Sequence, residues 1–163
     1  MIESKILGEF GEFLAGCRLV SKGHKILRTR YRKWGGEIDI ISTKNKVIYF
    51  NEIKTRIGKG KDGVDLRNIG ITRHKVSKVI KCAQHFIQNE IADIFYTTKQ
   101  FDAYFLEVVL NQEIKRIQED VSTVSDLKCY FTEGKIRILA TYIENMDREV
   151  FGCYGTSLIS DKD

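Results

Sequence analysis

Residues 36–56 read G-E-I-D-I-I-S-T-K-N-K-V-I-Y-F-N-E-I-K-T-R, and this stretch decides the fold. Its two halves, Glu37–Ser42 and Val47–Thr55, are apolar or alternate between apolar and polar residues. The polar residues 43–46 between them are typical of a tight turn. The pattern therefore predicts a β-hairpin.

Placing Lys44 and Asn45 at the tip of this hairpin puts Asp39 opposite Phe50. Because side chains alternate along a strand, acids and bases at every second position share one face. A slip of one residue would send Asp39 to the other face. Four charged side chains are thus predicted to project together: Glu37, Asp39, Glu52 and Lys54.

Carboxylates crowded on one sheet face repel one another unless a cation lies among them, and hard oxygen ligands suit Mg²⁺ or Mn²⁺. A nearby lysine adds a charge for a phosphate oxygen, so the cluster suits phosphodiester hydrolysis. The ordinary alternative is a solvated strand with cross-strand ion pairs, which explains most isolated E-x-K tripeptides. A carboxylate such as Asp39 inside an apolar strand costs stability and favours the functional interpretation.

The flanking sequence predicts a mixed α/β fold in the order helix, three strands, helix, strand. A helix is expected over residues 4–22, with an apolar stripe of Ile6, Phe10, Phe13, Leu14 and Cys17. A strand over 24–32 precedes the hairpin, a second helix begins after Thr72 as N-cap, and a last strand covers 101–110. Residues 1–120 form the expected domain. Residues 121–163 are an extension in which Glu133-Gly134 is expected to turn a second hairpin.

Charge is distributed unevenly. Residues 1–101 hold 20 Lys and Arg against 10 Asp and Glu, whereas residues 102–163 hold 7 against 12, and the net charge is +5. A basic half favours a polyanionic partner, although a solubilising surface explains charge alone equally well. Residues 13–36 contain no acid but seven bases: Arg18, Lys22, Lys25, Arg28, Arg30, Arg32 and Lys33.

The location expected from the sequence is cytoplasmic. No apolar run approaches the ~20 residues that span a bilayer, and the N-terminus does not resemble a signal peptide. The four cysteines form no C-x-x-C pair, so they are expected to be reduced thiols.

An Asp, a hairpin and then Glu-x-Lys resembles the PD-(D/E)XK nucleases, which share the restriction-endonuclease-like fold. More narrowly, the chain is similar to the YraN-like family of predicted bacterial endonucleases. The matching stretches cover roughly residues 5–118: G-E-F-G-E-F-L-A (8–15), R-T-R-Y-R (28–32), G-E-I-D-I-I (36–41), F-N-E-I-K-T-R (50–56), T-R-H-K (72–75) and F-D (101–102).

The resemblance implies a mixed sheet flanked by helices and assigns roles to particular residues. Asp39, Glu52 and the Ile53 carbonyl would be metal ligands, and Lys54 would activate the attacking water. Glu12 would complete the site from the first helix, with an exposed helix glutamate as the alternative. Glu37 would be a supporting acid or a partner of Lys54. The residues expected to contact nucleic acid are Arg30, Arg32, Arg56, Thr72, Lys75 and Lys78.

The function that follows is a Mg²⁺-dependent (or Mn²⁺-dependent) endonuclease acting on DNA, with branched or single-stranded intermediates included. Cleaving a four-way junction would require a homodimer, which the sequence leaves open. Two other classes also remain open: a non-catalytic nucleic-acid-binding module on the same fold, and an interaction protein that docks through its acidic C-terminal part.

Overall fold

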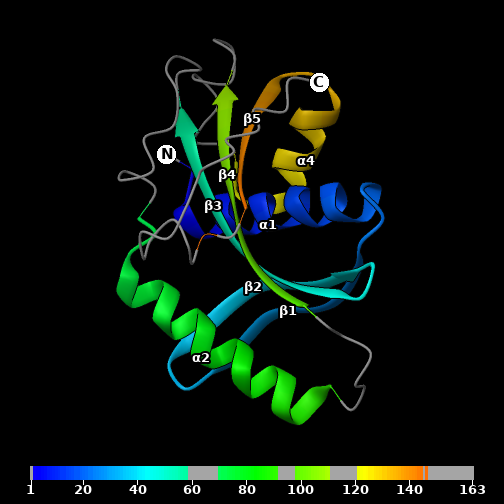
Figure 1. Cartoon of the computed structure of the whole chain (residues 1–163). Helices are drawn as coiled ribbons and strands as arrows, with labels where there is room; N and C mark the ends of the chain where they lie inside the picture. The colour runs from blue at the N-terminus through cyan, green and yellow to red at the C-terminus, as the bar shows by residue number, and fades with distance from the viewer. Residues whose placement is uncertain (1, 59–69, 92–97, 111–120, 145, 147–163) are drawn as a thin grey trace.

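The computed structural model describes residues 2–58, 70–91, 98–110, 121–144 and 146 (Figure 1). One five-stranded sheet has the strand order β1-β2-β3-β4-β5, with β3 and β4 parallel and the other neighbours antiparallel. This architecture confirms the expected mixed α/β fold of the restriction-endonuclease-like kind. The elements are α1 (Ser4–Ser21), β1 (Lys25–Lys33), β2 (Gly36–Lys44), β3 (Val47–Gly58), α2 (Arg73–Glu90), β4 (Thr98–Leu110), α4 (Val124–Thr132) and β5 (Ile136–Ile143).

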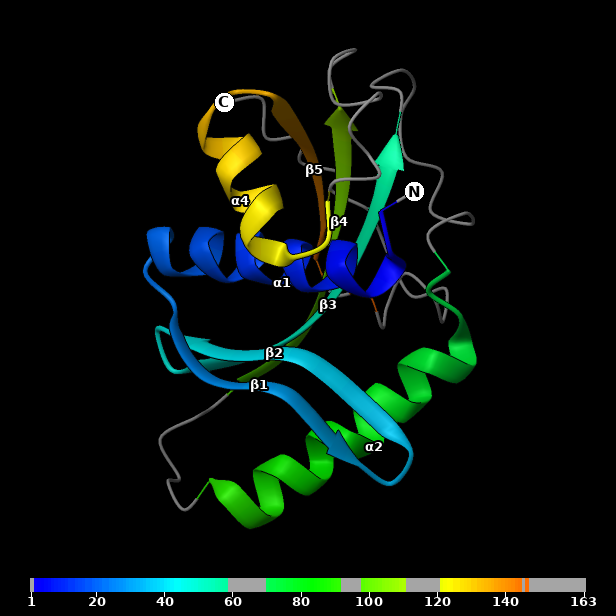
Figure 2. The same cartoon turned by 180° about the vertical axis from the view of Figure 1, so that it is seen from behind.

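Helices cover both faces of the sheet. Figures 1 and 2 show α1 and α4 on one face and α2 on the other. Alternating residues of the strands separate into two apolar layers, which hold the helices in place. On one face, Ile40, Ile53 and Leu106 of the strands pack against Ala15 and Leu19 of α1. On the other face, Ile41, Phe50 and Phe105 pack against Val79 and Phe86 of α2.

The tip of the β2–β3 hairpin differs from the prediction. Lys44 pairs with Val47, so Asn45 and Lys46 form the turn, and both have positive φ (50° and 64°) as a two-residue type I′ turn requires. The predicted pairing of Asp39 with Phe50 is wrong, because Phe50 pairs with Ile41. The shift is an even number of positions, so no side chain changes face.

The buried stripe of α1 is rotated from the predicted one. Phe10 is buried as expected, but Phe13 is 42% exposed and Cys17 is also exposed. The helix instead approaches β3 through Gly11, where an added Cβ would lie 1.7 Å from the Thr55 hydroxyl oxygen. Small side chains therefore set the contact of helix with sheet. The buried residues are Leu7, Phe10, Gly11, Ala15 and Leu19.

The predicted second hairpin is wrong. Residues 124–132 form helix α4, capped by Thr123 and Asp126, whose side chains each accept a hydrogen bond from the other's backbone N–H. The following β5 pairs antiparallel with β4, so this part of the extension completes the sheet. Residues 147–163 lie outside the described part of the chain. None of the described helices combines the length and apolarity needed to cross a bilayer.

Candidate active site

The β2–β3 ladder ends where the predicted site begins. Its last main-chain pair joins Ile40 to Asn51, and beyond it the Asp39 carboxylate accepts a hydrogen bond from the Ile53 N–H at 2.7 Å. A side chain thus replaces the neighbouring strand as the acceptor for β3. This contact holds Asp39 next to Glu52, which lies opposite it in the register and points to the same face of the sheet.

Glu52 is the centre of a buried ion-pair cluster. Its side chain is only 2% exposed, and its Oε1 lies 3.1 Å from the Lys54 ammonium. The Lys75 ammonium, near the start of α2, contacts the same oxygen. The sequence predicted that Lys75 contacts nucleic acid, whereas in the structure its ammonium group contacts the carboxylate of Glu52. Asp39, Glu52, Lys54 and Lys75 therefore come together from β2, β3 and α2.

Burial and neighbouring charges shift the pKa values of Asp39 and Lys75 in this cluster. Burial and, after it, the negative charge of Glu52 together raise the pKa of Asp39 from 3.8 to about 7, against the opposing effect of the hydrogen bond from Ile53. Burial lowers the pKa of Lys75, but attraction to Glu52 outweighs it and the net direction is upward. Lys75 therefore stays charged, and its positive charge also opposes the rise in the pKa of Asp39.

A second buried acid extends the same face. Glu107 of β4 is aligned with Arg56 in the parallel β3–β4 register, and their charged groups lie 3.7 Å apart. The Arg56 guanidinium also lies over the Phe105 ring, 4.7 Å from its centre. The sequence prediction missed Glu107, although an acid within the apolar strand F-L-E-V-V is the same signal that singled out Asp39.

Glu12 lies at the edge of the site rather than within the ion-pair cluster. Its carboxylate accepts a hydrogen bond from Arg30 at 2.8 Å, and its charge adds a smaller upward contribution to the pKa of Asp39. Arg30 has a positive φ of 49° inside β1, an uncommon conformation for a non-glycine residue. The structure thus joins these two predicted site residues to each other.

The remaining predicted residues are spread along the same region. Glu37 pairs with Arg32 at 2.9 Å rather than with Lys54. Thr72 caps α2 as expected, its hydroxyl accepting from the Lys75 N–H at 3.2 Å. Lys78 is exposed one turn further along α2.

The donor set agrees with a hard divalent cation. Among the described residues no three His, Cys, Asp or Glu side chains converge as a complete metal cage. Mg²⁺, however, is usually bound by one or two carboxylates and completes its shell with water and substrate phosphate. Asp39 and Glu52 supply such a pair, and the charge of Glu52 contributes, after burial, to the raised pKa of Asp39. The Ile53 carbonyl as a further ligand stays a prediction.

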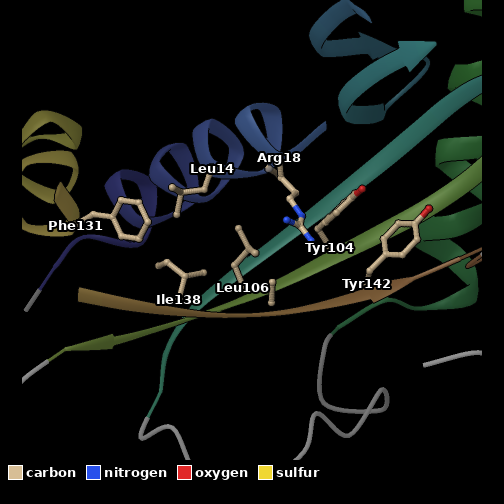
Figure 3. A pocket seen from close by; sticks show the side chains of 9 residues that line it. Leu14, Arg18, Tyr104, Leu106, Phe131, Ile138 and Tyr142 are labelled. Atoms are coloured by element: carbon tan, nitrogen blue, oxygen red, sulfur yellow. The ribbon is translucent and has the colours of Figure 1, made fainter. Parts of the chain in front are cut away.

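A separate cavity of about 280 Å³ lies on the opposite face of the sheet, between α1, α4, β4 and β5. Figure 3 shows Leu14 and Arg18 of α1 facing Tyr104 and Leu106 across it. Its lining is mainly apolar and contains no predicted catalytic residue. The cavity therefore has no evident part in the chemistry of the carboxylate cluster.

Comparison with known proteins agrees with the sequence resemblance. The model of the uncharacterised protein family UPF0102 matches residues 11–109, which include Asp39, Glu52, Lys54 and Lys75. A UPF0102 protein of Clostridium novyi is 38% identical over 109 residues, covering 67% of this chain and 85% of the relative. One from Caldanaerobacter subterraneus is 34% identical over 118 residues, covering 69% and 86%. The predicted YraN-like relationship is thereby confirmed, and the chain belongs to the uncharacterised protein family UPF0102.

Proposed function

We propose that this protein is a metal-dependent endonuclease that hydrolyses phosphodiester bonds of DNA, including branched or single-stranded intermediates. One observation carries the proposal: the half-buried carboxylate of Asp39 and the buried carboxylate of Glu52 come together with the ammonium groups of Lys54 and Lys75. Acids held this way cost stability, and a cleavage site for an anionic substrate gives them a use.

The carboxylates would hold Mg²⁺ or Mn²⁺. When bound, such an ion supplies Lewis-acid stabilisation of the phosphate and lowers the pKa of a water ligand. Asp39 is preorganised for this by the Ile53 N–H, which fixes the carboxylate without neutralising it.

The lysines act on the substrate's charge. Lys54 is about one third exposed, and so is Lys75, although both contact the buried Glu52. Their ammonium groups can therefore reach solvent at the surface of the cluster. There they stabilise negative charge on the phosphate, and Lys54 orients the attacking water.

A second candidate is a non-catalytic nucleic-acid-binding module. The observation that favours it is that Lys54 and Lys75 already neutralise Glu52 without a metal, as a purely structural ion-pair cluster would. In that case Asp39 would be protonated over part of the neutral pH range, and salt-sensitive DNA binding would not depend on it.

The test is cleavage of labelled linear, flapped and four-way-junction DNA in Mg²⁺, Mn²⁺ or EDTA. Unmodified protein is compared with Lys54→Ala and with Lys99→Ala, which removes the same charge from an exposed position on β4. Metal-dependent cleavage that Lys54→Ala abolishes and Lys99→Ala retains would support the proposal. Binding without cleavage of any substrate would refute it in favour of the binding module.

A further inference from the structure

Trp34 stands exposed at the tip of the β1–β2 hairpin. Lys33 pairs with Gly36, so Trp34 and Gly35 form the two-residue turn, with φ of 51° and 71°. The Trp34 side chain, the only tryptophan in the chain, is 65% exposed. Packing within the described residues does not account for so large an aromatic surface in water.

The indole is nevertheless held in a defined orientation. It meets the His85 ring of α2 edge to face, with the ring centres 4.8 Å apart. His85 Nδ1 in turn lies 2.8 Å from the hydroxyl of the buried Tyr31. The hairpin is seated directly on α2, because a Cβ at Gly36 would lie 2.6 Å from the Lys78 carbonyl oxygen. Trp34 is thus a preorganised contact and not a loose side chain.

Its surroundings are suited to a nucleic-acid strand. An open cavity of about 400 Å³ lies beside the indole, formed by the hairpin residues 32–37. Lys33 is exposed on the hairpin, Arg32 is exposed there and paired with Glu37, and Lys78 and Lys81 are exposed on α2. An aromatic face among cations is the combination that binds unpaired bases, since the cations contact phosphates and the ring stacks.

The distance from Trp34 to the carboxylate cluster corresponds to a few nucleotides. His85 lies ten positions after Lys75 in α2, which is about 15 Å along the helix. Asp39 lies three positions after Gly36 in β2, which is about 10 Å. At about 3.4 Å per step of duplex DNA, the indole lies about three or four steps from the cluster.

We propose that Trp34 stacks on an unpaired base about three or four nucleotides from the phosphate bound at Asp39 and Glu52. The substrates it selects are DNA molecules whose duplex is interrupted near the cleavage point, such as flaps and forks. This inference rests on the proposed nuclease function. Continuous duplex offers no open base face at that distance, so Trp34 adds nothing to its binding.

The experiment uses the full chain carrying Asp39→Ala, in EDTA, so that DNA binds without being cut. Because Trp34 is the sole tryptophan, its fluorescence reports this one position. We expect forked DNA to quench it and blunt duplex of equal length to leave it nearly unchanged. Adding Trp34→Ala should weaken binding of forked DNA about 5- to 150-fold, the loss that one base–aromatic stack represents.

Two further variants make the result specific. Trp34→Phe keeps an aromatic face and should recover part of the affinity for forked DNA, which a merely misfolded hairpin would not. Lys33→Ala removes a neighbouring charge and should weaken forked and blunt DNA equally. Equal loss on both DNAs in Trp34→Ala, or absence of quenching, would overturn the stacking proposal.

The cleavage assay separates this proposal from the one it rests on. Cleavage by the unmodified chain, with fluorescence that forked DNA leaves unquenched, overturns the base contact and keeps the nuclease. Quenching by forked DNA, with no cleavage in any metal, overturns the nuclease and supports the base contact.

Discussion

Replacing Asp39 with asparagine should stabilise the protein while removing cleavage. The pKa of Asp39 is raised from 3.8 to about 7 by burial and by Glu52. Above pH 7 the ionised carboxylate therefore opposes folding, by at most about 4 kcal/mol at about 1.4 kcal/mol per pH unit. Glu52 shares this repulsion, so we expect Asp39→Asn to raise the free energy of unfolding by about 2–4 kcal/mol at pH 8. The asparagine oxygen can still accept the hydrogen bond from Ile53.

Urea unfolding in EDTA between pH 4 and pH 8 measures this effect. The folded-state pKa lies above the unfolded one, so the unmodified protein gains stability as the pH falls from about 7 towards 4. The asparagine variant lacks that gain, and the two proteins should converge near pH 4. Saturating Mg²⁺ should stabilise the unmodified protein and have little effect on the variant. A variant less stable than the unmodified protein at pH 8 would refute the assignment of strain to Asp39.

Four other substitutions test the packing of α1, the carboxylate cluster and the cap of α4. Gly11→Ala should lower the free energy of unfolding by about 1–3 kcal/mol because its Cβ has no room. Gly8→Ala has open space around it and should raise the free energy of unfolding by up to about 1 kcal/mol. Urea unfolding measures both effects. Lys75→Ala removes one cation from Glu52 and should lower kcat about 100-fold in initial-rate measurements. Asp126 has its pKa lowered by hydrogen bonds from the N-cap residue; its stabilisation is present above the unfolded pKa and is lost in acid. Asp126→Asn should therefore unfold at lower temperature at pH 7 but not at pH 2.

The sequence was sufficient for the central part of the fold. The polar turn between two apolar segments predicted the β2–β3 hairpin, and the parity of side chains predicted the shared face of Asp39 and Glu52. Both depend on local, period-two patterning, which tertiary contacts rarely overturn. The turn itself was misplaced because Lys46 has a positive φ, whereas the usual signal for such a turn is glycine in that place.

Two errors have a different physical origin. The stripe of α1 was predicted from its large apolar residues, but Gly11 and Ala15 face the sheet and Phe13 lies under the Lys128 ammonium, 3.7 Å from the ring centre. Helix α4 is short, so its periodicity does not distinguish a helix from a strand. The capping pattern of Thr123 was the signal available.

The candidate site was predicted only in part. Asp39, Glu52 and Lys54 lie on one hairpin, so spacing alone places them together. The approach of Lys75 to Glu52 depends on how α2 packs against the sheet, and the pairing of Arg56 with Glu107 depends on the parallel β3–β4 register. Neither follows from local pattern, because both join segments distant in the sequence.

The parallel pairing of β3 with β4 has a consequence for the rate of folding. These two strands meet only after residues 59–97 have been traversed, whereas the β1–β2 and β2–β3 contacts are local. Closing so long a segment is entropically slow compared with forming a hairpin. The chain has no proline, so prolyl isomerisation adds no slow phase of its own. Refolding should therefore be limited by this one crossover, and the complete carboxylate cluster, which needs α2 from within it, forms in the last step.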